Sequence, residues 1–165
     1  MRTIPNRKIT DNFSLYEFIE ATLPAEAVAL NWKHISEFRE AEFIKLANFL
    51  QSLRNSINQQ FRAENNGNEI GLRITSGFRC KAWERLRKRS GDSQHTIAAA
   101  DVQPTNCSPQ LAVKIMDHLY KKYHPRTTGH FGGFAIKRPD IENGRILRIG
   151  FLHYDLRGWT ARWEY

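Results

Sequence analysis

The stretch SQHTIAAAD, residues 93–101, is the part of this sequence that most directly indicates its fold. A second stretch, FLHYD at 151–155, follows later in the chain. Together they hold two histidines and an aspartate in short apolar settings, namely His95, Asp101 and His153. Zinc binds imidazole nitrogen and carboxylate oxygen, and a catalytic zinc site uses three protein ligands and one open position. The two stretches therefore predict three ligands of one metal ion, with hydrogen-bonded core histidines as the alternative.

The first part of the chain carries the signals of helices. Ser14 and Glu17 have the spacing of a capping box, which predicts a helix start, and Pro24 suits the first position of a second helix. From 36 to 61 the apolar residues keep a helical period and predict a long amphipathic helix. Its apolar stripe is Phe43, Leu46, Ala47, Leu50, Leu53, Ile57 and Phe61. Further helices are predicted at 81–89 and after Ser108.

The second part of the chain carries the signals of strands. Apolar residues alternate with other residues over 70–74, which predicts a strand, and 98–102 predicts a short one. Asn143-Gly144 predicts a hairpin turn between 134–136 and 145–152. Helices first and an antiparallel sheet later indicate an α+β fold.

The length of 165 residues suits one domain with a core of its own. We expect this single domain to cover 1–165, with 1–65 mainly helical and 66–165 forming the sheet with the metal site. No apolar run approaches the roughly 20 residues of a membrane span, and no secretion signal is recognised. Cys80 and Cys107 lack zinc-finger spacing, and they can be free thiols or one disulfide.

The net charge of +8 and the pI of about 9.8 favour an anionic partner. The basic residues are densest over 81–89, where a solvated helix face is the alternative to a binding site. Nothing in the sequence resembles a nucleic-acid-binding module, so nucleic acid ranks last as a partner.

Residues two apart in a strand share a face, so His153 and Asp155 should point the same way, with Arg157 continuing the row. Two roles for Asp155 stay open at this point. It can act as a general base on a water molecule, or it can orient a metal ligand through a hydrogen bond.

Four segments in order carry a family resemblance: FSLYEF at 13–18, RITSGFR at 73–79, SQHTIAAAD at 93–101 and FLHYDLRG at 151–158. This order resembles the zinc D-alanyl-D-alanine carboxypeptidase family. That family includes vancomycin-resistance dipeptidases and phage endolysin peptidases, and it is related to the hedgehog signalling domain. The similarity runs from about residue 12 to residue 163, which is nearly the whole chain.

The resemblance implies a peptidase-like α+β domain, with N-terminal helices on a small antiparallel sheet. It implies zinc bound by His95, Asp101 and His153. It also implies that Arg79 holds the substrate through a carboxylate or carbonyl, and that Ser93 and Gln94 line the site. The substrate would be a peptidoglycan stem or cross-link peptide, cleaved next to a D-amino acid by a carboxypeptidase or an endopeptidase.

The sequence departs from the family pattern in two ways that concern the site. His95 and Asp101 are six positions apart where the family has seven, and Ala98 stands where glycine is expected. Gly150 occupies the position, three before the last histidine, where many relatives carry a catalytic acid. Asp155 is then the candidate general base, and His130 is a weaker third candidate whose alternative is an exposed loop residue.

The leading interpretation is a zinc-dependent peptidoglycan peptidase, in which Asp155 and Arg79 act on the substrate. The alternative is an inactive peptidase-like protein that binds the cell wall or forms part of a virion. We expect a monomer made in the cytoplasm, phage-encoded, and acting on the host wall or packaged in a virion. Peptidoglycan peptide is the expected substrate, and anionic wall polymer is a further expected partner of the basic surface.

Overall fold

The computed structural model describes residues 4–124 and 132–165 of the chain. The α-helices are Leu15–Ile19 (α1), Ala25–Lys33 (α2), Glu40–Phe61 (α3), Lys81–Leu86 (α4) and Pro109–Tyr123 (α5). Two 3-10 turns lie at Ile35–Glu37 (η1) and Gln94–Thr96 (η2). The strands are Gly71–Ser76 (β1), Ala99–Thr105 (β2), Gly133–Lys137 (β3), Asp140–Glu142 (β4), Arg145–Arg148 (β5), Phe151–Asp155 (β6) and Ala161–Glu164 (β7). The mixture of helices and sheet confirms the α+β class.

The main sheet is mixed, which corrects the expectation of a wholly antiparallel sheet. In the described residues its strand order is β1-β2-β6-β3-β7, and β3 pairs with β7 in parallel. The physical reason is that the chain reverses direction once between β6 and β7. Strand β6 is antiparallel to β3, and β7 runs opposite to β6. When β7 pairs with the edge of β3 that faces away from β6, it therefore runs parallel to β3.

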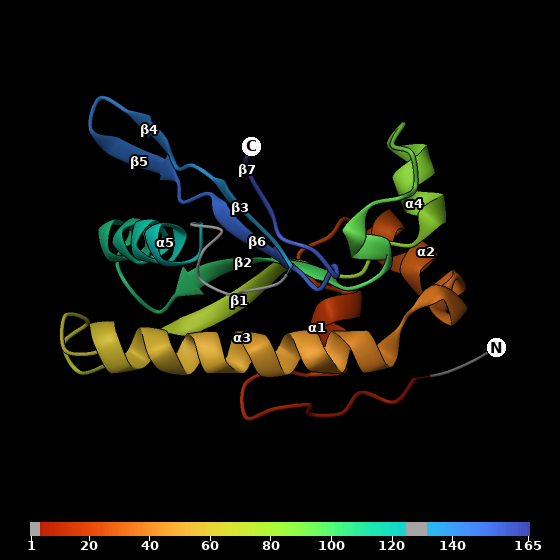
Figure 1. Ribbon diagram of the computed structural model, residues 1–165, viewed down its shortest axis with the longest axis horizontal. Coiled ribbons are helices and arrows are strands. Elements are labelled where there is room, and N and C mark those ends of the chain that lie inside the picture. Colours follow the sequence, from red (N-terminus) through yellow and green to blue (C-terminus); the bar gives the residue numbers. More distant parts are fainter. Residues whose placement is uncertain (1–3, 125–131) are drawn as a thin grey trace.

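The turn at Asn143-Gly144 is present, but it joins different strands from those expected. Asn143 has φ 50° and Gly144 has φ 77°, the positive values that a tight hairpin turn requires. The turn connects β4 to β5, which form a separate two-stranded sheet. The expected strand over 145–152 is broken at Gly150, where φ is 81°. The hairpin therefore projects from the body of the molecule, and β3 pairs directly with β6 (Figure 1).

The long helix α3 buries the apolar stripe predicted from the sequence, and all seven of its members are buried. It begins at Glu40, later than predicted, because Ile35–Glu37 forms a separate 3-10 turn. At the start of α1 the Glu17 carboxylate accepts a hydrogen bond of 2.6 Å from the Ser14 N–H, as the capping box predicts. At the start of α5 the Ser108 hydroxyl accepts one of 3.2 Å from the Leu111 N–H.

The two faces of the sheet have different neighbours. Tyr154 of β6 packs against Phe49 of α3 and Tyr123 of α5, with ring centroids 5.3 and 6.5 Å apart. Neighbouring residues of a strand point to opposite faces, so His153 lies on the face away from these two helices. Helix α3 runs the length of the molecule below the sheet, while α2 and α4 lie together at one end (Figure 1).

Within the described residues, none of the helices combines the length and apolarity needed to cross a bilayer. Cys80 and Cys107 are both free thiols, so the disulfide alternative does not apply in this structure.

Candidate metal centre

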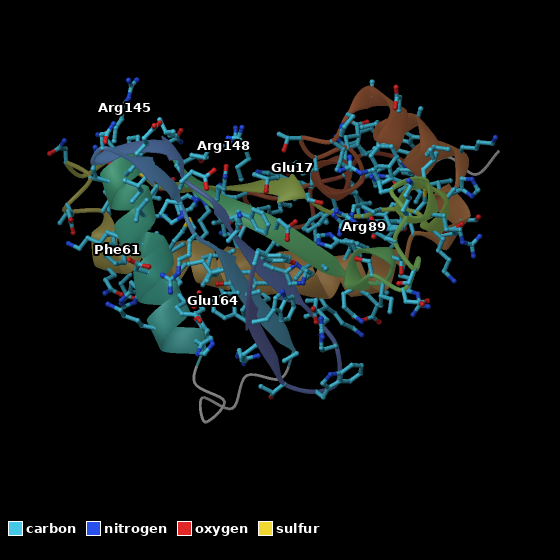
Figure 2. All side chains as sticks on the ribbon, turned by 90° about the horizontal axis from the view of Figure 1, so that it is seen from above. Glu17, Phe61, Arg89, Arg145, Arg148 and Glu164 are labelled. Carbon is cyan, nitrogen blue, oxygen red and sulfur yellow. The ribbon has the colours of Figure 1, made fainter. Side chains whose placement is uncertain are left out.

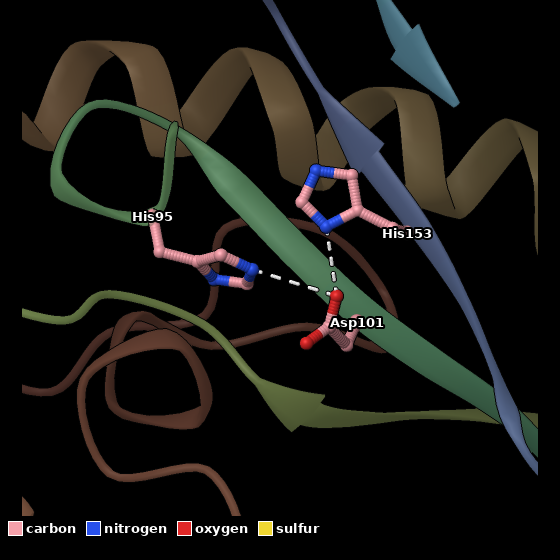
Figure 3. A group of neighbouring side chains, drawn as sticks. All are labelled: His95, Asp101 and His153. Carbon is pink, nitrogen blue, oxygen red and sulfur yellow. Dashed lines mark hydrogen bonds and ion pairs between the residues drawn. The ribbon is translucent and has the colours of Figure 1, made fainter. Parts of the chain in front are cut away.

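Three side chains from three elements converge on the face of the sheet opposite α3 and α5. His95 comes from η2, Asp101 from β2 and His153 from β6 (Figure 3). Asp101 Oδ1 lies 3.4 Å from His95 Nε2 and 2.8 Å from His153 Nδ1. One donor atom from each residue lies within 4.8 Å of the others.

The spacing of these donors fits a metal ion. Two ligands at 2.0–2.1 Å from a tetrahedral zinc ion lie roughly 3.4 Å apart, which is the separation of His95 Nε2 from Asp101 Oδ1. The contact of 2.8 Å between Asp101 and His153 is shorter and has the length of a hydrogen bond. The group could therefore hold a metal ion after a small opening at His153.

Strand register places two of the three candidate ligands. Asp101 of β2 is paired directly with His153 of β6, so their side chains leave the same face side by side. The same row continues to Ala135 of β3 and Trp163 of β7. Although the segment from His95 to Asp101 is one residue shorter than in the resembled family, the 3-10 turn still brings His95 to Asp101.

A backbone carbonyl orients His95. The Nδ1 of His95 lies 2.6 Å from the Gly77 carbonyl oxygen, and because a carbonyl only accepts, Nδ1 carries the proton. That leaves a lone pair on Nε2, which is buried and has no hydrogen-bond partner among the described residues. The N–H of Arg79 also donates to the His95 carbonyl over 3.1 Å. A metal ligand whose second nitrogen donates to a carbonyl is the arrangement that fixes imidazole for coordination.

His153 lies between two carboxylates. Its Nδ1 is 2.8 Å from Asp101 Oδ1 and its Nε2 is 3.1 Å from Asp155 Oδ2. Burial alone would lower the pKa of His153, but the hydrogen bonds to Asp101 and Asp155 outweigh it and raise the pKa above its ordinary value. Without a metal, the ring can satisfy both carboxylates only as the imidazolium ion. A cation at Nδ1 can take the place of that proton.

The remaining ligands have the charge states that metal binding needs. Burial lowers the pKa of His95, and Asp101 only partly opposes this effect, so the ring is neutral. Burial alone would raise the pKa of Asp101, but the two neighbouring imidazoles outweigh it and hold the pKa well below its ordinary range. Asp101 is therefore anionic at neutral pH, the charge state that a metal-binding carboxylate needs.

Asp155 is surrounded by hydrogen-bond donors. Its Oδ1 accepts from the Gly133 N–H at 2.9 Å and the Arg157 N–H at 3.1 Å, and Arg157 Nη2 donates to Oδ2 at 2.6 Å. Burial would raise the pKa of Asp155, but the bonds to His153 and Arg157 hold it well below its ordinary range. These contacts favour the orienting role for Asp155, and its role as a general base stays a prediction without structural support.

Gly150 stands where many members of the resembled family carry an acid, and its backbone conformation requires glycine. Gly150 has φ 81°, and a Cβ at this position would overlap the carbonyl oxygen of Lys137. No side chain fits there, so this position supplies no acid. His130, the third candidate for a base, lies outside the described residues.

An open cleft of about 610 Å³ adjoins the candidate metal centre. Asp101 lines it together with Arg79 and Ser93, which the sequence predicted at the site. The Nη2 of Arg79 donates to the Ser93 hydroxyl over 3.2 Å. Gln94 is half-buried and is not among the residues that line this cleft. The rest of the lining is Glu84, Arg89, Ser90, Asp92, Lys137, Phe151 and Tyr165.

Several residues of the site were not found by sequence reasoning. The Trp163 ring packs at a tilt against the His153 ring, with centroids 5.1 Å apart, because β7 pairs with β3 in register, and nothing local in the sequence indicates that pairing. Gly133 and Glu84 likewise carried no recognised signal. Gly77 lies inside the SGFR segment, which does carry a sequence signal. That signal assigns a role to Arg79 and none to the Gly77 carbonyl that binds His95.

Comparisons of the chain with protein-family models, with curated proteins and with solved structures find no match.

Proposed function

We propose that this chain is a zinc-dependent peptidase of the D-alanyl-D-alanine carboxypeptidase type, acting on peptidoglycan peptides next to a D-amino acid. The observation that carries the proposal is the convergence of His95, Asp101 and His153 beside a cleft that Arg79 also lines. Two imidazoles and one carboxylate form a donor set that suits zinc and leaves a coordination position for catalysis. The four ordered sequence segments that resemble this family support the same assignment.

A zinc ion at this site would supply Lewis acidity, polarising an amide carbonyl and activating water near neutral pH. The residues of the chain supply binding and orientation. Asp155 holds the ring of His153 through Nε2, so that Nδ1 faces Asp101. The Gly77 carbonyl does the same for His95. Arg79 offers its guanidinium group to a substrate carboxylate or carbonyl in the cleft, a role that its planar set of donors suits.

The test combines metal analysis with digestion of purified muropeptides. The wild-type protein should hold about one zinc ion per chain, the stoichiometry expected of a three-ligand site, and it should cleave the peptides. His153→Ala should lose both properties. His34→Ala is the matched control, since His34 lies at the end of α2 and its partly exposed ring pairs with Glu37 over 3.2 Å. Zinc content near zero in the wild type, or digestion unchanged in His153→Ala, would reject the proposal.

The second candidate is a peptidase-like wall-binding or virion protein without activity. Two observations favour it: Gly150 leaves no acid at that position, and Asp155 is already engaged by its neighbours. Such a protein should bind cell walls fully in the presence of chelator and show no turnover when zinc is supplied.

A further inference from the structure

Glu84 is a fully buried carboxylate at the edge of the cleft. Its side chain has no exposed surface, and it belongs to the short helix α4. Glu84 Oε1 lies 2.9 Å from Arg79 Nε and 3.3 Å from Arg89 Nη1. Burying a charge is strongly unfavourable unless the charge is paired. The two arginines supply that pairing, and both of them line the same cleft as Asp101.

The end of α4 places Arg89 on Glu84. The helix stops after Leu86, earlier than the sequence predicts, because Lys88 takes a left-handed conformation with φ 56°. The Arg89 N–H then donates to the Glu84 carbonyl over 3.0 Å, and the Lys88 N–H to the Arg85 carbonyl over 2.9 Å. This is the Schellman pattern of helix ends. It turns the chain back, so that the Arg89 side chain also reaches Glu84. Figure 2 shows Arg89 far from Arg145 and Arg148 of the hairpin.

The start of α4 is held as firmly as its end. The Cys80 N–H donates to the Asn31 side-chain oxygen over 2.9 Å, and the Asn31 amide donates to the Phe78 carbonyl over 2.8 Å. Asn31 is completely buried. Helix α2 therefore fixes the segment that carries both Arg79 and the first turn of α4.

Arg79 is held at two of its three nitrogens. Its Nε forms an ion pair with Glu84, although the Nε–H does not point at the carboxylate oxygen. Its Nη2 donates a hydrogen bond to the Ser93 hydroxyl. No partner for Nη1 is found in the described part of the chain, so this nitrogen remains for a ligand. The Arg79 side chain is only 15% exposed. An arginine side chain has much rotamer entropy to lose, and holding it before the ligand arrives removes that cost from binding.

We propose that Glu84 is a positioning residue that holds the Arg79 guanidinium in place for the substrate. The inference rests on the proposed function, because it takes Arg79 as the group that binds substrate. Glu84 acts through Arg79, and among the described residues no hydrogen bond or ion pair joins its side chain to His95, Asp101 or His153. Its loss should therefore weaken substrate binding while metal content stays as in the wild type.

The test is Glu84→Gln, which keeps the shape of the side chain and removes its charge. With a synthetic stem peptide, KM should rise about tenfold, the effect of one lost charged interaction, while kcat and zinc content change little. In an Arg79→Ala background the same substitution should have no further effect on KM. Glu64→Gln is the matched control, since Glu64 forms an exposed ion pair with Lys114. If Glu84→Gln does not fold, Glu84→Asp tests the same contact. It keeps the negative charge but moves the carboxylate one methylene away from the Arg79 guanidinium.

The outcomes separate this inference from the proposed function. An unchanged KM in Glu84→Gln, or an equal effect in the Arg79→Ala background, overturns the inference alone. If the wild type binds the stem peptide without cleaving it, calorimetry replaces kinetics, and binding about tenfold weaker in Glu84→Gln supports the inference. If the wild type neither binds nor cleaves the peptide, the proposed function and this inference fall together.

Discussion

Asp155 owes its position to the residue directly across the sheet from it. Gly133 of β3 is its register partner, and the Gly133 N–H donates to Asp155 Oδ1 over 2.9 Å. A Cβ on Gly133 would overlap the Asp155 carboxylate. At the residue scale, the site therefore requires glycine at position 133, because any side chain there would occupy the space of the Asp155 carboxylate.

Gly133→Ala should displace the Asp155 carboxylate and release the ring of His153. We expect zinc affinity to fall by about 10- to 100-fold, the usual effect of losing a group that orients a ligand. Competition with a chromogenic chelator measures this change. Gly158→Ala is the control, since nothing lies within 4 Å of a Cβ placed there. Equal affinities of Gly133→Ala and wild type would show that Asp155 does not orient His153.

At the scale of elements, helix α4 is defined by how it ends. Its last turn closes over Lys88, a non-glycine residue at φ 56°. That conformation is costly for a residue with a Cβ, and glycine is the usual residue at this position of the motif. The chain accepts this strain at the turn that brings Arg89 to Glu84.

Lys88→Gly should relieve the strain and raise the free energy of unfolding by about 0.5 to 1 kcal/mol. The Lys88 side chain is exposed and forms no hydrogen bond or ion pair with the described residues, so little else is lost. Urea denaturation measures the effect. Arg85→Gly, in the last turn of the same helix, should instead lower the free energy of unfolding by about 1 kcal/mol. A destabilised Lys88→Gly would contradict this account of the helix end.

At the scale of the whole molecule, one face of the sheet forms the packed core and the other carries the candidate metal centre. One face packs on α3 and α5 through Phe49, Tyr123 and Tyr154. The other presents Asp101 and His153, to which η2 adds His95. A metal ion at this point would join segments that are distant in the chain, so metal binding and folding should be linked.

The gain in stability from zinc should increase as pH rises above about 6.5, the ordinary pKa of histidine. The folded pKa of His153 is raised, so its protonation stabilises the metal-free protein below that pH, and this contribution is lost as pH rises through the folded pKa. His95, whose pKa is lowered by burial, is already neutral in this range. Because zinc must displace the proton of His153, binding becomes easier over the same interval.

Thermal melting with zinc and with chelator, at pH 6 and at pH 8.5, measures this linkage. Zinc at 100 times its dissociation constant should add about 2.7 kcal/mol to the free energy of unfolding. For a chain of this size each kcal/mol raises Tm by roughly 2–4 °C. A zinc-dependent shift in Tm that is equal at the two pH values would exclude the proton on His153 as the competitor.

Much of the local structure could be predicted because its causes lie within a few residues. The stripe from Phe43 to Phe61 follows from helical periodicity, and all its predicted members are buried. The caps at Ser14 and Ser108 act over three residues, and both are present. The three residues predicted as metal ligands are those that the structure brings together, because a short turn and one strand pairing suffice to join them.

The sequence by itself determined these local elements and the identity of the three candidate ligands. Only the tertiary structure decided that β7 pairs in parallel with β3, which places Trp163 on His153. It alone decided that Gly133 makes room for Asp155 and that Glu84 holds Arg79. The physical reason is the sequence separation over which each interaction acts. Helix caps and hydrophobic periodicity involve residues that are close in the chain. Strand order and the pairing of buried charges depend instead on segments that meet only when the whole core has packed.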